Sequence, residues 1–151
     1  DAPQPLVAYL DNATIDAPDL GARLDALAAA GAPVILAVGQ PDLPRPITGH
    51  APTQRRVDLL AIEQNAWRLA ARDPRCVVVA TRTEIDWAMK HGQMVVWAPS
   101  KIVLDAHDGP KRADDGLALA LWLADHLNAL RVVVHGPVTI PAGCRVPVER
   151  V

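Results

Sequence analysis

The chain has 151 residues, long enough for one domain with its own core, so neither a disulfide nor a structural metal is needed for stability. Its net charge of −2, with acidic and basic residues interspersed, excludes the broad positive field that drives non-specific nucleic-acid binding. No stretch approaches the roughly 20 apolar residues of a membrane-spanning helix, so we predict a soluble protein without a membrane partner.

Five near-continuous apolar runs predict short β-strands. Runs without strict alternation are typical of strands covered on both faces, as in parallel sheets flanked by helices. The predicted strands are Leu6–Leu10, Pro33–Val38, Cys76–Ala80, Met94–Ala98 and Arg131–His135. The tail from Pro141 to Val151 can add a further strand at the edge, where Pro147 is tolerated.

Helical patterns lie between these runs. The first places Leu20, Leu24 and Leu27 on one face and ends at Gly31. The second runs from Thr53 to Arg72. We expect it to bury Val57, Leu60, Ala61, Trp67 and Ala70, and to leave Arg55, Glu63 and Arg68 for solvent or ligand.

The third helix is short. We expect it to follow Thr83, whose hydroxyl can cap it together with Asp86, and to end at Gly92. The fourth spans Arg112–Asn128 and is apolar around most of its circumference, which predicts burial on more than one side. It lies either under the long loop from Gln40 to Pro52 and the C-terminal tail, or in an interface with a protein partner or a second copy.

The alternation of strands and helices predicts an α/β fold with an open, mainly parallel, doubly wound sheet of about five strands, which is Rossmann-like. We expect residues 1–151 to form a single domain. Because the chain begins at Asp1 and not at Met, we also expect that it was trimmed or excised from something longer. Cys76 and Cys144 have no CxxC spacing, which favours inert, half-buried thiols and a cytoplasmic location.

Ligands of such sheets bind outside the carboxyl ends of the strands, so the residues that follow each apolar run are candidates for a site. Asn12 and Thr14 follow the first run, and Thr81, Arg82 and Thr83 follow the third. Hydroxyls, a guanidinium and the free N–H groups of a helix start favour an anion, here a small phosphorylated ligand. The alternative is that Thr83 only caps a helix and Arg82 is a solvated charge.

Two segments carry a resemblance to a known family. The run Leu6–Leu10 ends in Asp11 with Thr14 close behind, and residues 66–96 place a helix ending at Pro74 before an apolar strand, a short helix and another strand. Both segments look like parts of haloacid-dehalogenase-like (HAD) phosphohydrolases. The resemblance implies that Asp11 corresponds to the catalytic nucleophile of that family.

Other parts of the HAD machinery are missing. Ala13 stands where the family has its acid and base Asp, and a methyl group cannot protonate a leaving group. Thr81 replaces an expected Asp, which leaves Asp86 as the nearest carboxylate, and Arg55 or Arg56 is a poor substitute for the family's Lys. The resemblance therefore implies a domain that kept the fold and lost phosphoryl transfer together with most magnesium ligands.

A second set of carboxylates suggests an enzyme instead. Asp114 and Asp115 precede an apolar helix, which resembles a motif of PIN-like nucleases, where several carboxylates bind divalent cations that activate water. Together with Asp11 they could bind Mg²⁺. Acidic residues are, however, also common in the first turn of any helix.

The sequence thus favours a catalytically eroded HAD-like domain, a pseudoenzyme that binds a small ligand or a protein and needs no cofactor. The alternative is a Mg²⁺-dependent phosphohydrolase or PIN-like nuclease, with Asp11 and Asp86 as catalytic residues, or with Asp11, Asp114 and Asp115 as metal ligands. We do not expect nucleic-acid binding by the non-catalytic domain, because the four Trp residues are interpreted as packing anchors and not as a platform for bases.

Overall fold

Six parallel strands form one sheet in the order β3–β4–β2–β1–β5–β6. The computed structural model describes residues 4–42, 51–110 and 115–151. The strands are β1 (Leu6–Leu10), β2 (Val34–Val38), β3 (Cys76–Val79), β4 (Met94–Trp97), β5 (Arg131–His135) and β6 (Val148–Arg150). The predicted α/β class and parallel sheet are confirmed, and β6 is the edge strand expected in the tail.

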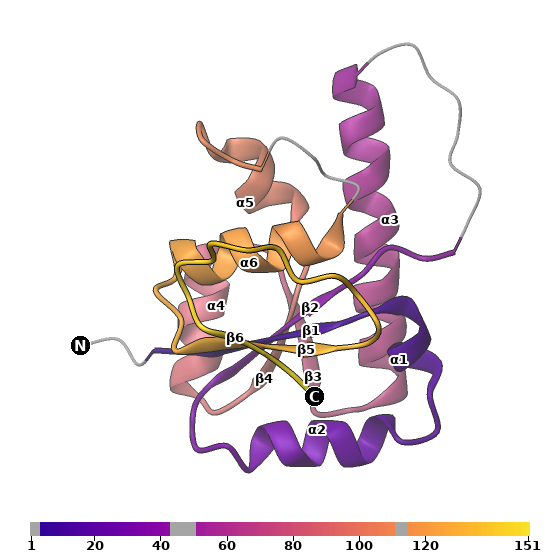
Figure 1. Ribbon diagram of the computed structural model, residues 1–151, viewed down its shortest axis with the longest axis vertical. Coiled ribbons are helices and arrows are strands. Elements are labelled where there is room, and N and C mark those ends of the chain that lie inside the picture. The colour runs from indigo at the N-terminus through magenta and orange to yellow at the C-terminus, as the bar shows by residue number, and fades with distance from the viewer. Residues whose placement is uncertain (1–3, 43–50, 111–114) are drawn as a thin grey trace.

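Helices cover both faces of this sheet. They are α1 (Asn12–Asp16), α2 (Leu20–Ala28), α3 (Ala51–Arg72), α4 (Arg82–Lys90), α5 (Ser100–Asp105) and α6 (Gly116–His126). In Figure 1, α2 and α6 lie on opposite faces of β1 and β5. From β1 the chain forms β2 and then β3 at one edge of the sheet, and it then returns through β4 to β5 and β6 at the other edge. Because crossovers between parallel strands are right-handed, α2 and α3 lie on one face of the sheet, and α4 and α6 lie on the other.

The central strands β1 and β2 consist entirely of buried residues, because each has a paired strand on both sides and helices above and below. Their register aligns the strand ends: Leu10 lies beside Val38 and beside His135. The residues that follow, Asp11 and Gly39, are held by backbone hydrogen bonds from Asp11 N to the His135 carbonyl (3.3 Å) and from Gly39 N to the Leu10 carbonyl (2.9 Å). The sheet topology therefore brings distant segments together at its carboxyl edge.

The predicted core face of α3 was wrong in large part: Ala70 packs against the core, and Val57 and Ala61 are half-buried, but the large side chains face outward. Leu60 and Trp67 are 59% and 62% exposed, so this Trp is not a packing anchor. The helix instead buries the residues Leu59, Ile62, Asn65, Ala66 and Leu69. These recur every three or four residues, but at 100° per residue they lie on nearly the opposite side of the helix from the predicted stripe. Periodicity alone cannot choose between them.

Two further helix predictions need correction. The cap of α4 is Thr81 and not Thr83: the Thr81 side chain accepts from Glu84 N, while the Glu84 carboxylate accepts from Thr81 N, a capping box. A second exposed Trp, Trp87 at 55%, lies on this helix. The fourth predicted helix begins at Gly116, and its predicted first residues, 112–114, lie outside the described part of the chain.

The apolar helix α6 is largely covered within the chain. It contacts β1, β2 and β5 through its buried residues, and its outer side, with Leu121 and Trp122, lies against the connection from β5 to β6 (residues 136–147). Of the two predicted environments, the structure thus shows burial under the C-terminal tail. No described helix is long and apolar enough to cross a membrane.

Candidate functional site at the carboxyl edge of the sheet

The carboxyl ends of β1 and β5 form a point where neighbouring strands lead to opposite faces of the sheet. After β1 the chain turns into α1 and α2, whereas after β5 it passes to the face that α6 covers. In doubly wound sheets, ligands bind at such a switch point. We therefore consider the residues that follow β1, β2 and β5 first.

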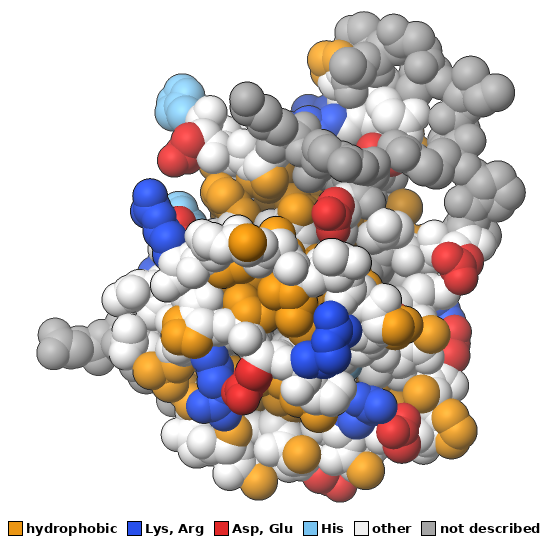
Figure 2. Space-filling view, viewed as in Figure 1, with side chains coloured by type: hydrophobic (Ala, Val, Ile, Leu, Met, Phe, Trp, Pro, Cys, Tyr) orange, Lys and Arg blue, Asp and Glu red, His pale blue; other side chains and the backbone are white. Residues whose placement is uncertain are grey.

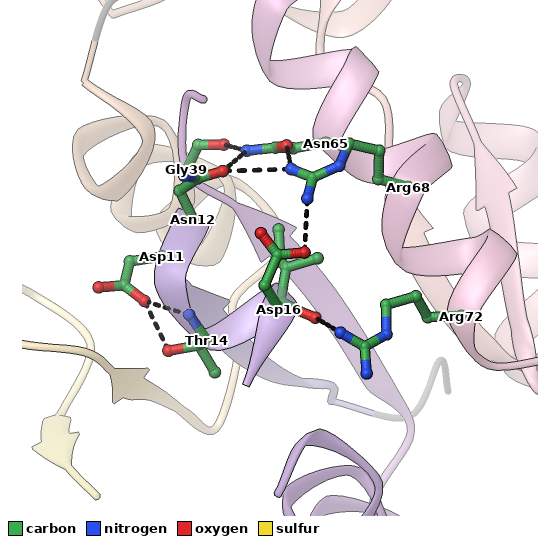
Figure 3. Close-up of polar contacts among 9 residues, drawn as sticks. Asp11, Asn12, Thr14, Asp16, Gly39, Asn65, Arg68 and Arg72 are labelled. Atoms are coloured by element: carbon green, nitrogen blue, oxygen red, sulfur yellow. Dashed lines mark hydrogen bonds and ion pairs between the residues drawn. The ribbon is translucent and has the colours of Figure 1, made fainter. Parts of the chain in front are cut away.

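Asp11 follows β1 and caps α1. Its Oδ1 accepts hydrogen bonds from Thr14 N (2.9 Å) and from the Thr14 hydroxyl (2.5 Å), as Figure 3 shows. Its carboxylate also lies against Gly136, where any Cβ would collide with it and where φ is +117°. Glycine is thus required after β5 for close approach as well as for backbone conformation. Asp11 and Thr14, both predicted site residues, are indeed together, and Thr14 is buried.

The start of α6 lies directly against the end of β2. A Cβ at Gly116 would be 2.8 Å from Gly39 Cα and 2.9 Å from the Val38 carbonyl oxygen, so only glycine allows this backbone contact. Gly116 N also donates to Gln40 Oε1 (3.2 Å). Asp115, which caps α6 by accepting from the N–H of residue 118, is thereby placed at the same edge as Asp11.

Tyr9 lies beneath these two carboxylates and is only 4% exposed. Burial raises the pKa of its hydroxyl far above the ordinary value, and the negative charges of Asp11 and Asp115 raise it further. We name Tyr9, Asp11 and Asp115 the Tyr9 cluster. Sequence reasoning overlooked Tyr9, although a lone Tyr inside an apolar strand next to the strand end was a usable signal.

A second polar group joins α3 to α1. Asn65, fully buried, donates to Asn12 Oδ1 (3.1 Å) and to the Gly39 carbonyl (2.8 Å). Arg68 Nη1 donates to Asn65 Oδ1 (2.7 Å) and its Nη2 to Asp16 Oδ1 (2.5 Å), and Figure 3 shows all these side chains pointing toward one another. Asn12, a predicted ligand residue, is therefore committed to an internal contact. Asn65 was missed because the core face of α3 was assigned wrongly.

The third predicted cluster lies elsewhere. Thr81 caps α4, and Arg82 pairs with Asp86 one turn later (3.2 Å), with about half of each side chain exposed. Since β4 and β2 separate β3 from β1, three strand spacings, or about 14 Å, lie between this cluster and the end of β1. The structure therefore does not bring Asp86 or residues 81–83 to Asp11.

The predicted metal ligands are only partly placed. Asp11 and Asp115 are both close enough to Tyr9 to affect its pKa, whereas Asp114 lies outside the described residues. Within residues 4–42, 51–110 and 115–151, no three His, Cys, Asp or Glu side chains are arranged to hold a metal ion. At this edge of the sheet, the described residues thus offer two carboxylates, those of Asp11 and Asp115, to a cation.

His135, the last residue of β5, is a buried titratable group to which sequence reasoning gave no specific role. Its Nδ1 accepts from Arg23 Nη1 (2.9 Å), while Nε2 is buried without a partner among the described residues. Burial and the charge of Arg23 lower the pKa of the imidazole. The ring is therefore neutral at pH 7, with its proton on Nε2.

Comparison with known proteins adds no relative. Neither a scan against protein-family models nor a search of curated proteins gives a match for this chain.

Proposed function

We propose that this protein is a catalytically eroded, HAD-like binding module whose ligand binds at the Tyr9 cluster. The observation that carries the proposal is the Tyr9 side chain, 4% exposed at the carboxyl edge of the sheet, with the carboxylates of Asp11 and Asp115 both close enough to raise its pKa. Ligands of doubly wound sheets bind at this edge. A phenol beside two carboxylates offers a ligand hydrogen bonds there that an apolar residue would not offer.

The charges of the cluster indicate the chemistry of the ligand. Two carboxylates and one phenol accept hydrogen bonds and attract positive charge, so they suit an amine or a polyol. A phosphorylated ligand, expected from the sequence, would be repelled by Asp11 and Asp115 unless a cation accompanied it. The guanidinium groups near this edge are already paired: that of Arg68 binds Asp16 and Asn65, and that of Arg150 binds the Gly136 carbonyl.

The hydrogen bonds of Asp11 support a binding role over a catalytic one. One carboxylate oxygen already accepts two hydrogen bonds from Thr14, so Asp11 has a structural task as the cap of α1. Ala13, two residues later, supplies no acid or base.

One observation favours the alternative, a Mg²⁺-dependent phosphohydrolase or nuclease. Asp11 and Asp115 are distant in the sequence yet close to the same Tyr, and carboxylate oxygens are the ligands that Mg²⁺ prefers. In that case the two carboxylates would hold the cation, and the cation would offset the repulsion between them and a phosphate group.

Thermal unfolding separates the two functions. For a binding module we expect spermidine or inositol to raise the melting temperature and millimolar Mg²⁺ or Mn²⁺ to leave it unchanged. Tyr9→Phe, which removes only the hydroxyl, should abolish the rise. A melting temperature that rises with Mg²⁺ in the wild type, but not in Asp11→Asn or Asp115→Asn, would support the enzyme instead and justify assays on phosphate esters and nucleic acids.

The same variant tests the role of the hydroxyl in the fold. Tyr9→Phe keeps the aromatic ring, so its free energy of unfolding should stay within about 1 kcal/mol of that of the wild type. A larger loss would mean that the hydroxyl serves the fold through a hydrogen bond within the protein, and the proposal would lose its basis.

A further inference from the structure

A second concave site lies on the other side of α6, away from the Tyr9 cluster. It is a pocket of about 440 Å³ between the outer side of α6, the chain after α5 and the β5–β6 connection. Its lining residues are Asp108, Leu121, Trp122, Asp125, Cys144, Arg145 and Val146, and we name it the Trp122 pocket. Its volume falls at the lower end of the range for small-molecule sites.

One part of the wall of the Trp122 pocket is apolar and held in place. Val146 is 9% exposed, and Leu121 and Trp122 pack against the core cluster. The Trp122 ring stacks on His126, with the ring centroids 5.0 Å apart and the planes 12° from parallel. In Figure 2, hydrophobic side chains gather in the middle of the face that carries α6 and the β5–β6 connection, with charged side chains around them.

The described part of the pocket rim carries more negative than positive charge. Among the described lining residues, Asp108 and Asp125 contribute carboxylates and Arg145 contributes a cation. Arg145 Nη1 lies 3.8 Å from Asp125 Oδ2, with the two side chains 84% and 49% exposed. Such a long, solvated ion pair adds little stability, so neither charge is needed to hold the fold.

We propose that the Trp122 pocket binds small amphipathic amines, with the apolar body of the ligand against Trp122 and Val146 and its ammonium group at Asp108 and Asp125. The aromatic face and the carboxylates both attract a cation. An anion of the same shape would be repelled by the net charge of the rim. For a ligand of about ten non-hydrogen atoms, we expect a dissociation constant on the order of 1 mM. This inference does not depend on the ligand of the Tyr9 cluster.

Cys144 provides a direct measurement. Both cysteines are free, Cys144 is exposed in the pocket lining, and Cys76 is buried, contrary to the prediction that both are half-buried. Burial raises the pKa of the Cys76 thiol to about 11, so a neutral reagent such as iodoacetamide should modify Cys144 first. Phenethylamine at ten times its dissociation constant should slow this reaction about tenfold by occupying the pocket.

Matched probes and variants complete the test. 2-Phenylethanol should protect Cys144 less than phenethylamine, and 3-phenylpropionate least. Asp125→Asn should weaken protection by phenethylamine about two- to fivefold. Asp25→Asn removes a carboxylate on α2 that is more exposed than Asp125 and pairs with Arg75, and it should have no effect. The indole N–H signal of Trp122 in NMR spectra, assigned with Trp122→Phe, reports binding independently of the thiol. Equal protection by all three probes, or no protection and no indole shift at 50 mM phenethylamine, would overturn the proposal.

Discussion

Replacing Gly116 by Ala tests the contact that places α6 over the sheet. The new methyl carbon would be 2.8 Å from Gly39 Cα and 2.9 Å from the Val38 oxygen, and both are backbone atoms of a central strand end. Real Cβ atoms do not approach this closely, so either the start of α6 or the end of β2 must move. Overpacking of this kind costs about 1–3 kcal/mol, which lowers the melting temperature by roughly 2–12 °C in a domain of this size.

Gly21→Ala is the matched control. Gly21 is also near the start of a helix, α2, and a Cβ there meets no atom within 4 Å. Because alanine loses less backbone entropy on folding, this variant should be more stable by about 0.4–1 kcal/mol. Urea denaturation followed by circular dichroism measures both variants. If Gly116→Ala unfolds within 0.5 kcal/mol of the wild type, the close contact between α6 and β2 does not exist, and the position of Asp115 beside Tyr9 must be abandoned.

Three further predictions concern single side chains. Leu59→Ala should lower the free energy of unfolding by about 2–5 kcal/mol because Leu59 is fully buried, and Leu60→Ala should lower it by less than about 0.5 kcal/mol because Leu60 is 59% exposed. Similar losses for the two variants in urea denaturation would contradict the observed face of α3. Thr81→Ala should lower stability by about 1 kcal/mol and Thr83→Ala hardly at all, and the reverse order would restore the cap predicted from sequence. His135 has a lowered pKa in the folded state. Its contribution to the free energy of unfolding is therefore complete above the pKa of an unfolded histidine, near 6.5, and is lost as the pH falls below that value. The pH dependence of unfolding between pH 7 and 5 should therefore be steeper in the wild type than in His135→Gln.

The strands were predictable because burial on both faces leaves a local signature. Each central strand of a parallel sheet must be apolar throughout, and the edge strand β3 is apolar as well, so five of the six strands appear as apolar runs, with bounds within one residue of those observed. The edge strand β6 is mostly polar or exposed and was suggested only by its place in the tail. Asp11 was found for the same reason, since the end of an apolar run marks the carboxyl edge.

The core face of α3 and the Tyr9 cluster required the tertiary structure. Two stripes of similar hydrophobicity lie on α3, and which of them is buried depends on contacts with β2, β3 and β4 that no local pattern records. The choice also decides that Asn65 faces inward to the Gly39 carbonyl.

The sequence by itself determined the parallel α/β sheet, its strands and the carboxylate at the end of β1, because these depend on local hydrophobicity and chain order. Only the tertiary structure decided that Asp115 joins Asp11 above a buried tyrosine, and that residues 81–86 stay apart from them. The physical reason is that these distances depend on strand order and on the backbone contact between Gly116 and Gly39. Strand order is set by which crossovers bury the most apolar surface together, a property of the whole chain and not of any segment.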